Sequence, residues 1–392
     1  MNDKTLLQTP PLSMYIHIPW CVRKCPYCDF NSHEAGKALD ESAYIAAIMA
    51  DLEQDHENHT INTIQSIFFG GGTPSLFSAE AIGDIITGVA GHIPLAADIE
   101  ITLEANPGTL EHGKFSDYRS AGVNRLSIGI QSFENDKLQK LGRIHDRNQA
   151  IKAIECAHRA GFDNINLDLM FGLPGQSPTD AIADVNLACD LEPTHISHYQ
   201  LTIEPNTFFH KHTPVLPDLD AIWDMQQQCH DRLHQHGYAH YEVSAFAKAD
   251  RQCRHNLHYW SFGDYIGIGA GAHGKSTQVD RHAVQRRWKH RQPEAYINHA
   301  LQGNACSGSH ELDQSEIIFE FLLNALRLRH GFGFELFEQR TGVDRARLLD
   351  ACRSIDDDLL VISETALCTS QRGFDFLNDV LEKFLNAVAP GR

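Results

Sequence analysis

The sequence predicts an α/β fold built as an incomplete parallel barrel of six strand–helix units, (β/α)6, with a small C-terminal domain. Short apolar runs alternate with longer amphipathic stretches from residue 12 to about residue 200. The runs are rich in β-branched and aromatic residues and end in Gly, Pro, Asn or Ser, which is typical of buried parallel strands. The length of 392 residues exceeds the usual size of a single core and leaves room for a further domain.

Six apolar runs mark the expected strands. They are MYIHI at 14–18, SIFFGGGTP at 66–74, DIEITLEANP at 98–107, RLSIGIQS at 125–132, NINLDLMFG at 164–172 and HISHYQLT at 195–202. Right-handed crossovers place the carboxyl ends of parallel strands on one face, where the ligands of such folds bind. Polar residues and glycines at the ends of these runs are therefore candidate site residues.

Helical patterns fill the gaps between the strands. Helices are expected at 40–57, 147–160 and about 218–236. The first has a cap residue at Asp40, followed by Tyr44, Ile48 and Leu52 on one face. The second ends at Gly161, a common helix stop.

The chain beyond the barrel divides into two further segments. Residues 237–290 are rich in His, Tyr, Trp and Gly, and residues 301–312 are small and polar, as in a linker. An apolar helical stripe at 317–326 and a short apolar run at 357–363 predict a small, mostly helical, winged-helix-like domain. We expect a barrel over 1–215, a His- and aromatic-rich extension over 216–300 and a C-terminal helical domain over 301–392.

The charge balance excludes some classes of partner. Lys and Arg number 33 against 51 Asp and Glu, and the net charge of −18 provides no general attraction for nucleic acid or an anionic membrane. The N-terminus lacks the apolar core of a secretion signal, and no stretch approaches the ~18 apolar residues of a membrane span. We therefore expect a cytoplasmic protein whose ten cysteines are free, catalytic or metal-bound rather than paired in disulfides.

Three cysteines form the strongest motif. Cys21, Cys25 and Cys28 give the spacing C-x3-C-x2-C directly after the first expected strand. Three thiolates can hold three corners of a [4Fe-4S] cluster, and no fourth cysteine follows closely, so one iron stays open to another ligand. The alternative is a zinc site with a distant fourth ligand.

Glycines and polar residues end the next four expected strands. Gly70-Gly71-Gly72-Thr73-Pro74 ends the second, Glu104 and Gln131 end the third and fourth, and Asp168 lies in the fifth. Glycines allow close backbone approach to a ligand. Polar groups in apolar runs are costly if buried without partners, so they indicate either satisfied core networks or ligand contacts.

Together these motifs resemble the radical S-adenosylmethionine (SAM) superfamily. PLSMYIHIPWCVRKCPYCDF, GGGTP, LEANPGT, GIQSF, LGRIHD and DLMFGLPGQ resemble its coproporphyrinogen III dehydrogenase branch over most of the first 300 residues. The resemblance implies that SAM chelates the open iron and yields a 5′-deoxyadenosyl radical, with Tyr27 beside the adenine and with Tyr15, Gly71 and Glu104 in contact with SAM. It also implies a second SAM site at Gly72, Thr73, Gln131, Arg143 and Asp168. The alternative is that Arg143 and Asp168 form a structural ion pair.

Three further features resemble the HemW family of haem chaperones within this branch. Phe30 stands where the dehydrogenase has a fourth cysteine, and only 20 residues precede Cys21. Residues 255–260 contain the motif H-N-x-x-Y-W, which implies haem binding by His255, Asn256, Tyr259 and Trp260. An imidazole can ligate haem iron, and aromatic side chains can pack on the porphyrin. The resemblance implies a carrier of haem b that delivers it to an acceptor protein such as a respiratory enzyme.

The alternative function is the dehydrogenase itself, an oxygen-independent enzyme that decarboxylates two porphyrinogen propionates oxidatively to vinyl groups. The SAM residues favour it, whereas Phe30 and the short N-terminus count against it. Near the haem motif, Cys253 and His258 are further candidate ligands. A basic run could attract haem propionates or form a solvated face; it comprises Arg281, Arg286, Arg287, Lys289 and Arg291. The G-x-G-x-x-G at 269–274 is interpreted as a tight turn rather than an NAD site, because no helix pattern follows it.

Overall fold

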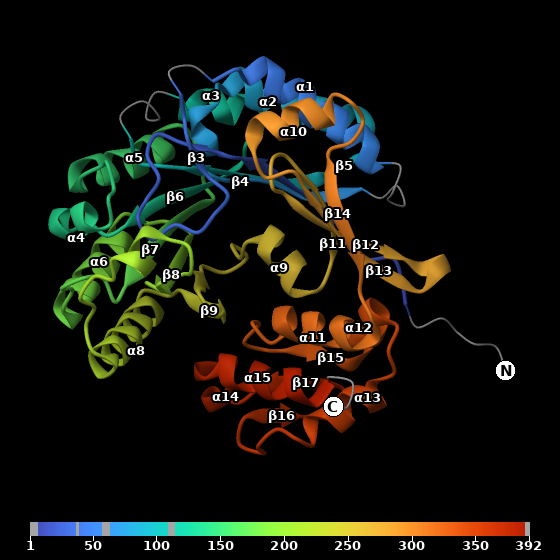
Figure 1. Ribbon diagram of the computed structural model, residues 1–392. Coiled ribbons are helices and arrows are strands. Elements are labelled where there is room, and N and C mark those ends of the chain that lie inside the picture. Colours follow the sequence, from blue (N-terminus) through green and yellow to red (C-terminus); the bar gives the residue numbers. More distant parts are fainter. Residues whose placement is uncertain (1–6, 37–38, 57–62, 109–113, 389–392) are drawn as a thin grey trace.

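A curved sheet of twelve strands forms the body of the molecule (Figure 1). The computed structural model describes residues 7–36, 39–56, 63–108 and 114–388. The six expected parallel strands are confirmed; they are β1 (Leu12–Ile18), β4 (Ile64–Gly71), β5 (Leu95–Ala105), β6 (Arg125–Gln131), β7 (Ile165–Phe171) and β8 (His195–Gln200). They are neighbours in chain order, β1-β4-β5-β6-β7-β8, as right-handed crossovers require.

Residues 239–311 enlarge this sheet at both edges. A seventh parallel strand, β11 (Asp264–Ile268), pairs with β1, and β12 (His273–Gln278), β13 (Ala283–Lys289) and β14 (Cys306–Glu311) follow it antiparallel. At the other edge β10 (Ala245–Ala247) pairs antiparallel with β8, and β9 (Ala239–Glu242) pairs with β10. The prediction of a linker at 301–312 is therefore wrong for Cys306–Glu311, because these small polar residues pair with β13 as an edge strand.

Helices cover the outside of the sheet (Figure 1). They are α1 (Glu41–His56), α2 (Ala79–His92), α3 (Phe115–Ser120), α4 (Asn135–Lys140), α5 (Arg147–Arg159), α6 (Pro178–Asp190), α8 (Leu219–Gln235) and α10 (Pro293–Ala300). Capping side chains start several of them: Asp40 accepts from the Ala43 amide at 2.9 Å, and Asp146 forms a capping box with Gln149. The expected apolar face of α1 is confirmed, since Tyr44, Ile48 and Leu52 are fully buried in the barrel core.

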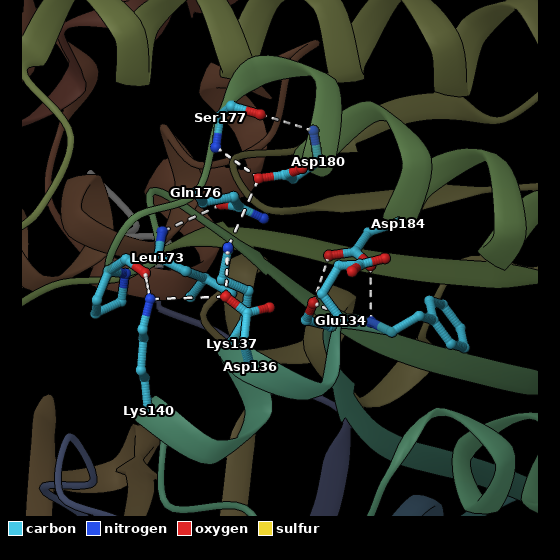
Figure 2. Close-up of polar contacts among 12 residues, drawn as sticks. Glu134, Asp136, Lys137, Lys140, Leu173, Gln176, Ser177, Asp180 and Asp184 are labelled. Carbon is cyan, nitrogen blue, oxygen red and sulfur yellow. Dashed lines mark hydrogen bonds and ion pairs between the residues drawn. The ribbon is translucent and has the colours of Figure 1, made fainter.

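A polar network fixes α6 against the end of β6. The carboxylate of Asp184, on α6, accepts 2.7 Å bonds from the Ser132 hydroxyl and the Phe133 amide, the two residues after β6. Lys137 of α4 pairs with Asp136 at 2.8 Å and with Asp180, at the start of α6, at 3.7 Å (Figure 2). These bonds hold the carboxyl end of β6, where the candidate residue Gln131 lies.

The C-terminal segment packs as a small, mostly helical module. Its elements are α11 (Gln314–Ala325), β15 (Phe332–Gly333), α12 (Phe334–Thr341), α13 (Arg345–Cys352), β16 (Leu360–Ile362), β17 (Ala366–Thr369), α14 (Gln371–Asp375) and α15 (Leu377–Val388). The strands form a three-stranded antiparallel sheet in the order β15-β17-β16. Phe262 and Val284 of the barrel side join the core of this module. Helix α9 (Arg254–Trp260) lies between the curved sheet and the module (Figure 1). Within the described residues, none of the helices combines the length and apolar character needed to cross a membrane.

Candidate functional site

A cavity of about 370 Å³ opens at the carboxyl ends of the parallel strands. The structure brings thirteen of the predicted site residues to its wall; they are Cys21, Cys25, Tyr27, Cys28, Gly71, Gly72, Thr73, Glu104, Gln131, Arg143, Asp168, Asn256 and Trp260. Tyr15, His255 and Tyr259 are the predicted residues that do not line it. We call this space the cysteine cavity.

The loop that carries the cysteines is closed by its own backbone. Two short strands, β2 (Trp20–Cys21) and β3 (His33–Glu34), pair in parallel and bracket the loop, and the Ala35 amide donates to the Cys21 carbonyl at 2.8 Å. Burial raises the pKa of the Cys21 and Cys28 thiols. Metal binding at these sulfurs therefore has to displace protons. Among the described residues, no three His, Cys, Asp or Glu side chains lie in an arrangement that could hold a metal ion.

The glycine turn between β11 and β12 supports this loop from behind. Gly269 and Gly271 have φ values of 100° and 79°, in the left-handed region, and the next element is the strand β12 instead of a helix. The Asn31 side-chain amide donates to the Ala270 carbonyl at 2.8 Å, and a Cβ on Gly271 would lie 2.4 Å from the Asn31 Nδ2. The interpretation of this motif as a tight turn is confirmed, and the turn serves to hold the cysteine loop.

Gly71 and Gly72 occupy positions where a side chain cannot fit. A Cβ on Gly71 would lie 2.4 Å from the His17 ring, and one on Gly72 would lie 2.4 Å from the Trp20 carbonyl oxygen. The Gly71 amide donates to Glu104 Oε2 at 3.2 Å. The backbone of the second strand is thereby exposed to whatever occupies the cavity.

Glu104 is a half-buried carboxyl group that lacks a cationic partner among the described residues. Burial, followed by the nearby charge of Asp168, raises its pKa to about 8. Among the described residues Glu104 forms no ion pair. A cationic ligand group would stabilise the carboxylate form here. SAM carries both an ammonium and a sulfonium group, so the donor set fits that cofactor.

Gln131 ends β6 in a strained conformation. Its φ of 68° is uncommon for a residue other than glycine, and its Oε1 accepts from the Tyr199 hydroxyl at 3.1 Å. Asp168 lies on the neighbouring strand and accepts from Asn166 Nδ2 at 2.8 Å and Ser127 Oγ at 3.3 Å. Burial raises the pKa of Asp168.

Arg143 contacts the cysteine loop and does not pair with Asp168. Its guanidinium donates to Asn106 Oδ1 at 2.6 Å, to the Gly129 carbonyl at 2.7 Å and to Cys25 Sγ at 3.6 Å. The Nε of Arg143 is buried without a partner. The alternative of a structural Arg143–Asp168 ion pair is therefore wrong, and Arg143 keeps one N–H free for a ligand.

Tyr15 lies behind the cavity wall. Its hydroxyl shares a hydrogen bond with His17 Nδ1 at 2.9 Å, and burial raises its pKa well above the usual value. A Cβ on Gly70 would lie 3.0 Å from the Tyr15 ring. Tyr15 therefore packs on the glycine strand and supports it from the β1 side.

The haem motif lies on α9, which presents two of its four residues to the cavity. Asn256 and Trp260 line the cavity, whereas His255 is 1% exposed and stacks on Phe68 with ring centroids 5.1 Å apart. Tyr259 packs edge-on against His255. The His255 Nδ1 bonds to Ser66 Oγ at 2.8 Å, and its Nε2 is buried without a partner. His255 therefore has an unused nitrogen but no access to the cavity in this conformation.

The two other candidate ligands near this motif are engaged elsewhere. His258 Nε2 bonds to the Asp264 carbonyl at 2.6 Å. The Cys253 Sγ lies 3.7 Å from Glu100 Oε1, and burial raises the pKa of this thiol to about 12. Cys253 is thus a protonated core thiol at neutral pH.

The basic run on β13 does not form a free cationic patch. Lys289 is buried between Asp51 and Asp55, and Arg287 pairs with Asp55 at 2.9 Å. Arg286 pairs with Glu320, and Arg281 pairs with Glu311 at 3.0 Å. The sequence left open an attraction for haem propionates or a solvated face; the acidic partners of these four side chains do not favour the attraction, and the burial of Lys289 does not fit a solvated face.

Several wall residues of the cysteine cavity were not expected from the sequence. They are Arg23, Phe30, Ala105, Asn106, Ser127, Gly129, Ser197, Tyr199, Glu242, Ser244 and Arg327. Asn106 and Tyr199 follow or end expected strands, so the strand-end rule could have found them. Arg327 follows α11 and pairs with Glu242 at 3.1 Å, and no local signal connects it to the barrel.

Comparison with known proteins gives one consistent family. Residues 15–188 match the model of the radical SAM superfamily, and residues 312–376 match that of the HemN C-terminal domain. The chain is 46% identical to a protein of Escherichia coli K12 named heme chaperone HemW, over 97% of this chain and 100% of that protein. It is also 46% identical to the Haemophilus influenzae HemW, over 96% and 98%, and 35% identical to that of Bacillus subtilis, over 96% and 100%.

The fold comparison agrees with the sequence relatives. The solved structure of E. coli coproporphyrinogen III oxidase HemN, a radical SAM enzyme, superposes with a TM-score of 0.81 at 22% identity, over 96% of this chain and 90% of that chain. At that identity the likeness concerns the fold. The full-length sequence relatives and the matched domains decide the family: this chain belongs to the HemW family of the radical SAM superfamily.

Proposed function

We propose that this chain is a cytoplasmic haem chaperone that binds haem b and transfers it to an acceptor protein such as a respiratory enzyme. The observation that carries the proposal is the 46% identity, over nearly the whole of both chains, to a protein named heme chaperone. Phe30 agrees with it: this residue stands where the resemblance implies a further cysteine in the dehydrogenase branch, and it lines the cysteine cavity with 60% of its surface exposed. The Asn256 and Trp260 side chains would form one wall of the haem site, with His255 and Tyr259 behind them.

The same cavity would hold the resident cofactors. Cys21, Cys25 and Cys28 would supply three thiolates to a [4Fe-4S] cluster, and SAM would complete the open iron. Together these groups supply one-electron chemistry when bound. Glu104 would bind the cationic end of SAM, and the backbone at Gly71 would approach SAM closely because glycine has no side chain. Tyr27 would pack beside the adenine. Tyr15 would support the strand that carries Gly71.

A second SAM site would use the remaining polar wall. Arg143 has an unpartnered N–H for a carboxylate, and the strained Gln131 is held toward the cavity by Tyr199. Gly72, Thr73 and Asp168 would complete this set. Because the residues expected to bind SAM, other than Tyr15, line the cavity, the second candidate function is the oxidative decarboxylation of coproporphyrinogen III.

Two assays on a single preparation of the protein distinguish the two candidate functions. The full chain is reconstituted anaerobically with iron and sulfide, titrated with hemin, and assayed with coproporphyrinogen III, SAM and reductant. A chaperone gives a saturable Soret band at one haem per chain and no protoporphyrinogen. Absence of specific haem uptake would refute the chaperone, and SAM-dependent formation of protoporphyrinogen would establish the enzyme.

A further inference from the structure

A second cavity lies between the barrel rim and the C-terminal module. Its volume is about 620 Å³, within the roughly 300–1,000 Å³ of small-molecule sites. The barrel contributes Phe171, His198, His230 and His240, and the module contributes Phe374 and Leu377, among others. Tyr199, Ser244 and Arg327 line both this cavity and the cysteine cavity, so the two spaces adjoin. We call it the histidine cavity.

We propose that the histidine cavity is the haem site and that His230 is the axial ligand of the iron. This inference rests on the proposed function, because it assigns a place and a ligand to the cargo. It differs from the assignment drawn from the sequence motif, which points to His255.

The imidazoles of this cavity lie close together. The centroid of the His230 ring is 5.9 Å from that of His198 and 4.9 Å from that of His240. An imidazole nitrogen can offer a lone pair to a metal.

His230 is the ring whose nitrogens remain available. His240 already bonds to the Val243 carbonyl at 3.3 Å, and His198 is 3% exposed with its Nδ1 buried and unpartnered. His230 is half-buried and faces the cavity from α8, and among the described residues its ring makes ring contacts but no hydrogen bond. It is thus both accessible and uncommitted, unlike His255.

The rest of the wall suits a porphyrin. Phe171 stacks on His198 with centroids 4.6 Å apart, and Phe374 meets the His240 ring edge-on at 5.4 Å, so aromatic surfaces face the space from both the barrel and the module. Apolar side chains complete that surface, including Leu323, Leu377 and Leu381.

One cation lies at the boundary of the two cavities, Arg327, which also pairs with Glu242 at 3.1 Å. Arg327 stacks over Trp260 at 4.3 Å and has an Nε that is buried without a partner. Two carboxylates, Asp375 and Asp379, also line the cavity, and Asp375 accepts from Gln371 Nε2 at 2.9 Å. A propionate at Arg327 would place the haem edge beside Trp260, which connects this site to the motif on α9.

The test compares three single variants of the reconstituted full chain. Hemin is titrated into wild type, His230→Ala, His234→Ala and His255→Ala, and the Soret band is read after gel filtration. His234 is the matched control, because it is exposed on the same helix four residues later and does not line the cavity. Far-UV circular dichroism checks that each variant is folded.

We expect His230→Ala to lose the ligated Soret position and to bind haem about tenfold or more weakly. His234→Ala stays close to wild type, and added imidazole restores the ligated spectrum of His230→Ala by filling the space of the missing ring. An unchanged spectrum in His230→Ala, or loss of ligation only in His255→Ala, would overturn the inference while leaving the chaperone intact. Failure of the wild type to take up haem would overturn both.

Discussion

The guanidinium of Arg143 donates to the Sγ of Cys25 across 3.6 Å, which joins the loop between α4 and α5 to the cysteine loop after β1. The two residues are 118 positions apart in the chain. The same guanidinium is fixed by Asn106 and by the Gly129 carbonyl, so the positive charge cannot swing away from the sulfur.

This contact predicts the electrochemistry of the reconstituted cluster. Replacing Arg143 with Met removes a fixed positive charge and a hydrogen-bond donor beside one thiolate ligand. Because reduction adds negative charge, we expect the midpoint potential to fall by tens of millivolts. A redox titration followed by electron paramagnetic resonance measures it. A potential equal to that of wild type would show that Arg143 does not act on the cluster.

The cysteines predict a selective loss of iron. Cys28→Ala should abolish cluster loading, since two thiolates remain for a site that needs three protein ligands. Cys368→Ala is the matched control, because this half-buried thiol lies on β17 in the C-terminal module. Iron and sulfide analysis after anaerobic reconstitution gives the result. Equal loading of the two variants would contradict the assignment.

The glycines predict opposite changes in stability. Gly72→Ala places a Cβ 2.4 Å from the Trp20 carbonyl oxygen, and we expect it to lower the free energy of unfolding by about 1–3 kcal/mol and to weaken SAM binding. Gly91→Ala, near the end of α2, meets no atom within 4 Å and should raise that free energy by up to about 1 kcal/mol. Urea denaturation and equilibrium SAM binding measure the two effects. A Gly72→Ala protein as stable as wild type would exclude the predicted clash.

A buried histidine predicts sensitivity to acid. Burial lowers the pKa of His145 from 6.5 to about 3, so between these values the unfolded chain binds a proton that the native chain does not. The stability that His145 contributes is present above pH 6.5 and is lost as the pH falls, by about 1.4 kcal/mol per pH unit. His145→Gln should therefore show a shallower loss of unfolding free energy between pH 6.5 and 4.5. Parallel curves for the two proteins would refute this.

Asp184 predicts a change of the opposite sign. Burial raises its pKa from 3.8 to about 7, so between these values the native chain holds a proton that the unfolded chain lacks. Its contribution to stability is present below pH 3.8 and is lost as the pH rises to 7. Asp184→Asn removes this loss, and its unfolding free energy should rise more steeply with pH than that of wild type. Urea titrations at several pH values between 4.5 and 7 measure the slope of the unfolding free energy against pH. A weaker bond to the Phe133 amide lowers the whole curve by a constant amount and leaves this slope unchanged.

The sequence by itself determined what depends on near neighbours in the chain. The six parallel strands follow from apolar runs and turn residues, and the end of α5 follows from the stop at Gly161. The three cysteines of the motif lie within eight residues, so their spacing alone predicts that they ligate an iron–sulfur cluster. The strand ends that carry Glu104, Gln131 and Asp168 could be placed on one face because parallel strands share a direction.

Only the tertiary structure decided what depends on distant partners. Lys289 is neutralised by Asp51, 238 residues earlier, and β14 is a strand because β13 lies beside it. His255 is enclosed by Phe68 and Ser66 from β4, whereas His230 faces an open cavity built from the barrel and the C-terminal module. Residue type tells which chemistry an imidazole can perform, but access, charge state and partners come from packing, and packing joins residues that no local pattern connects.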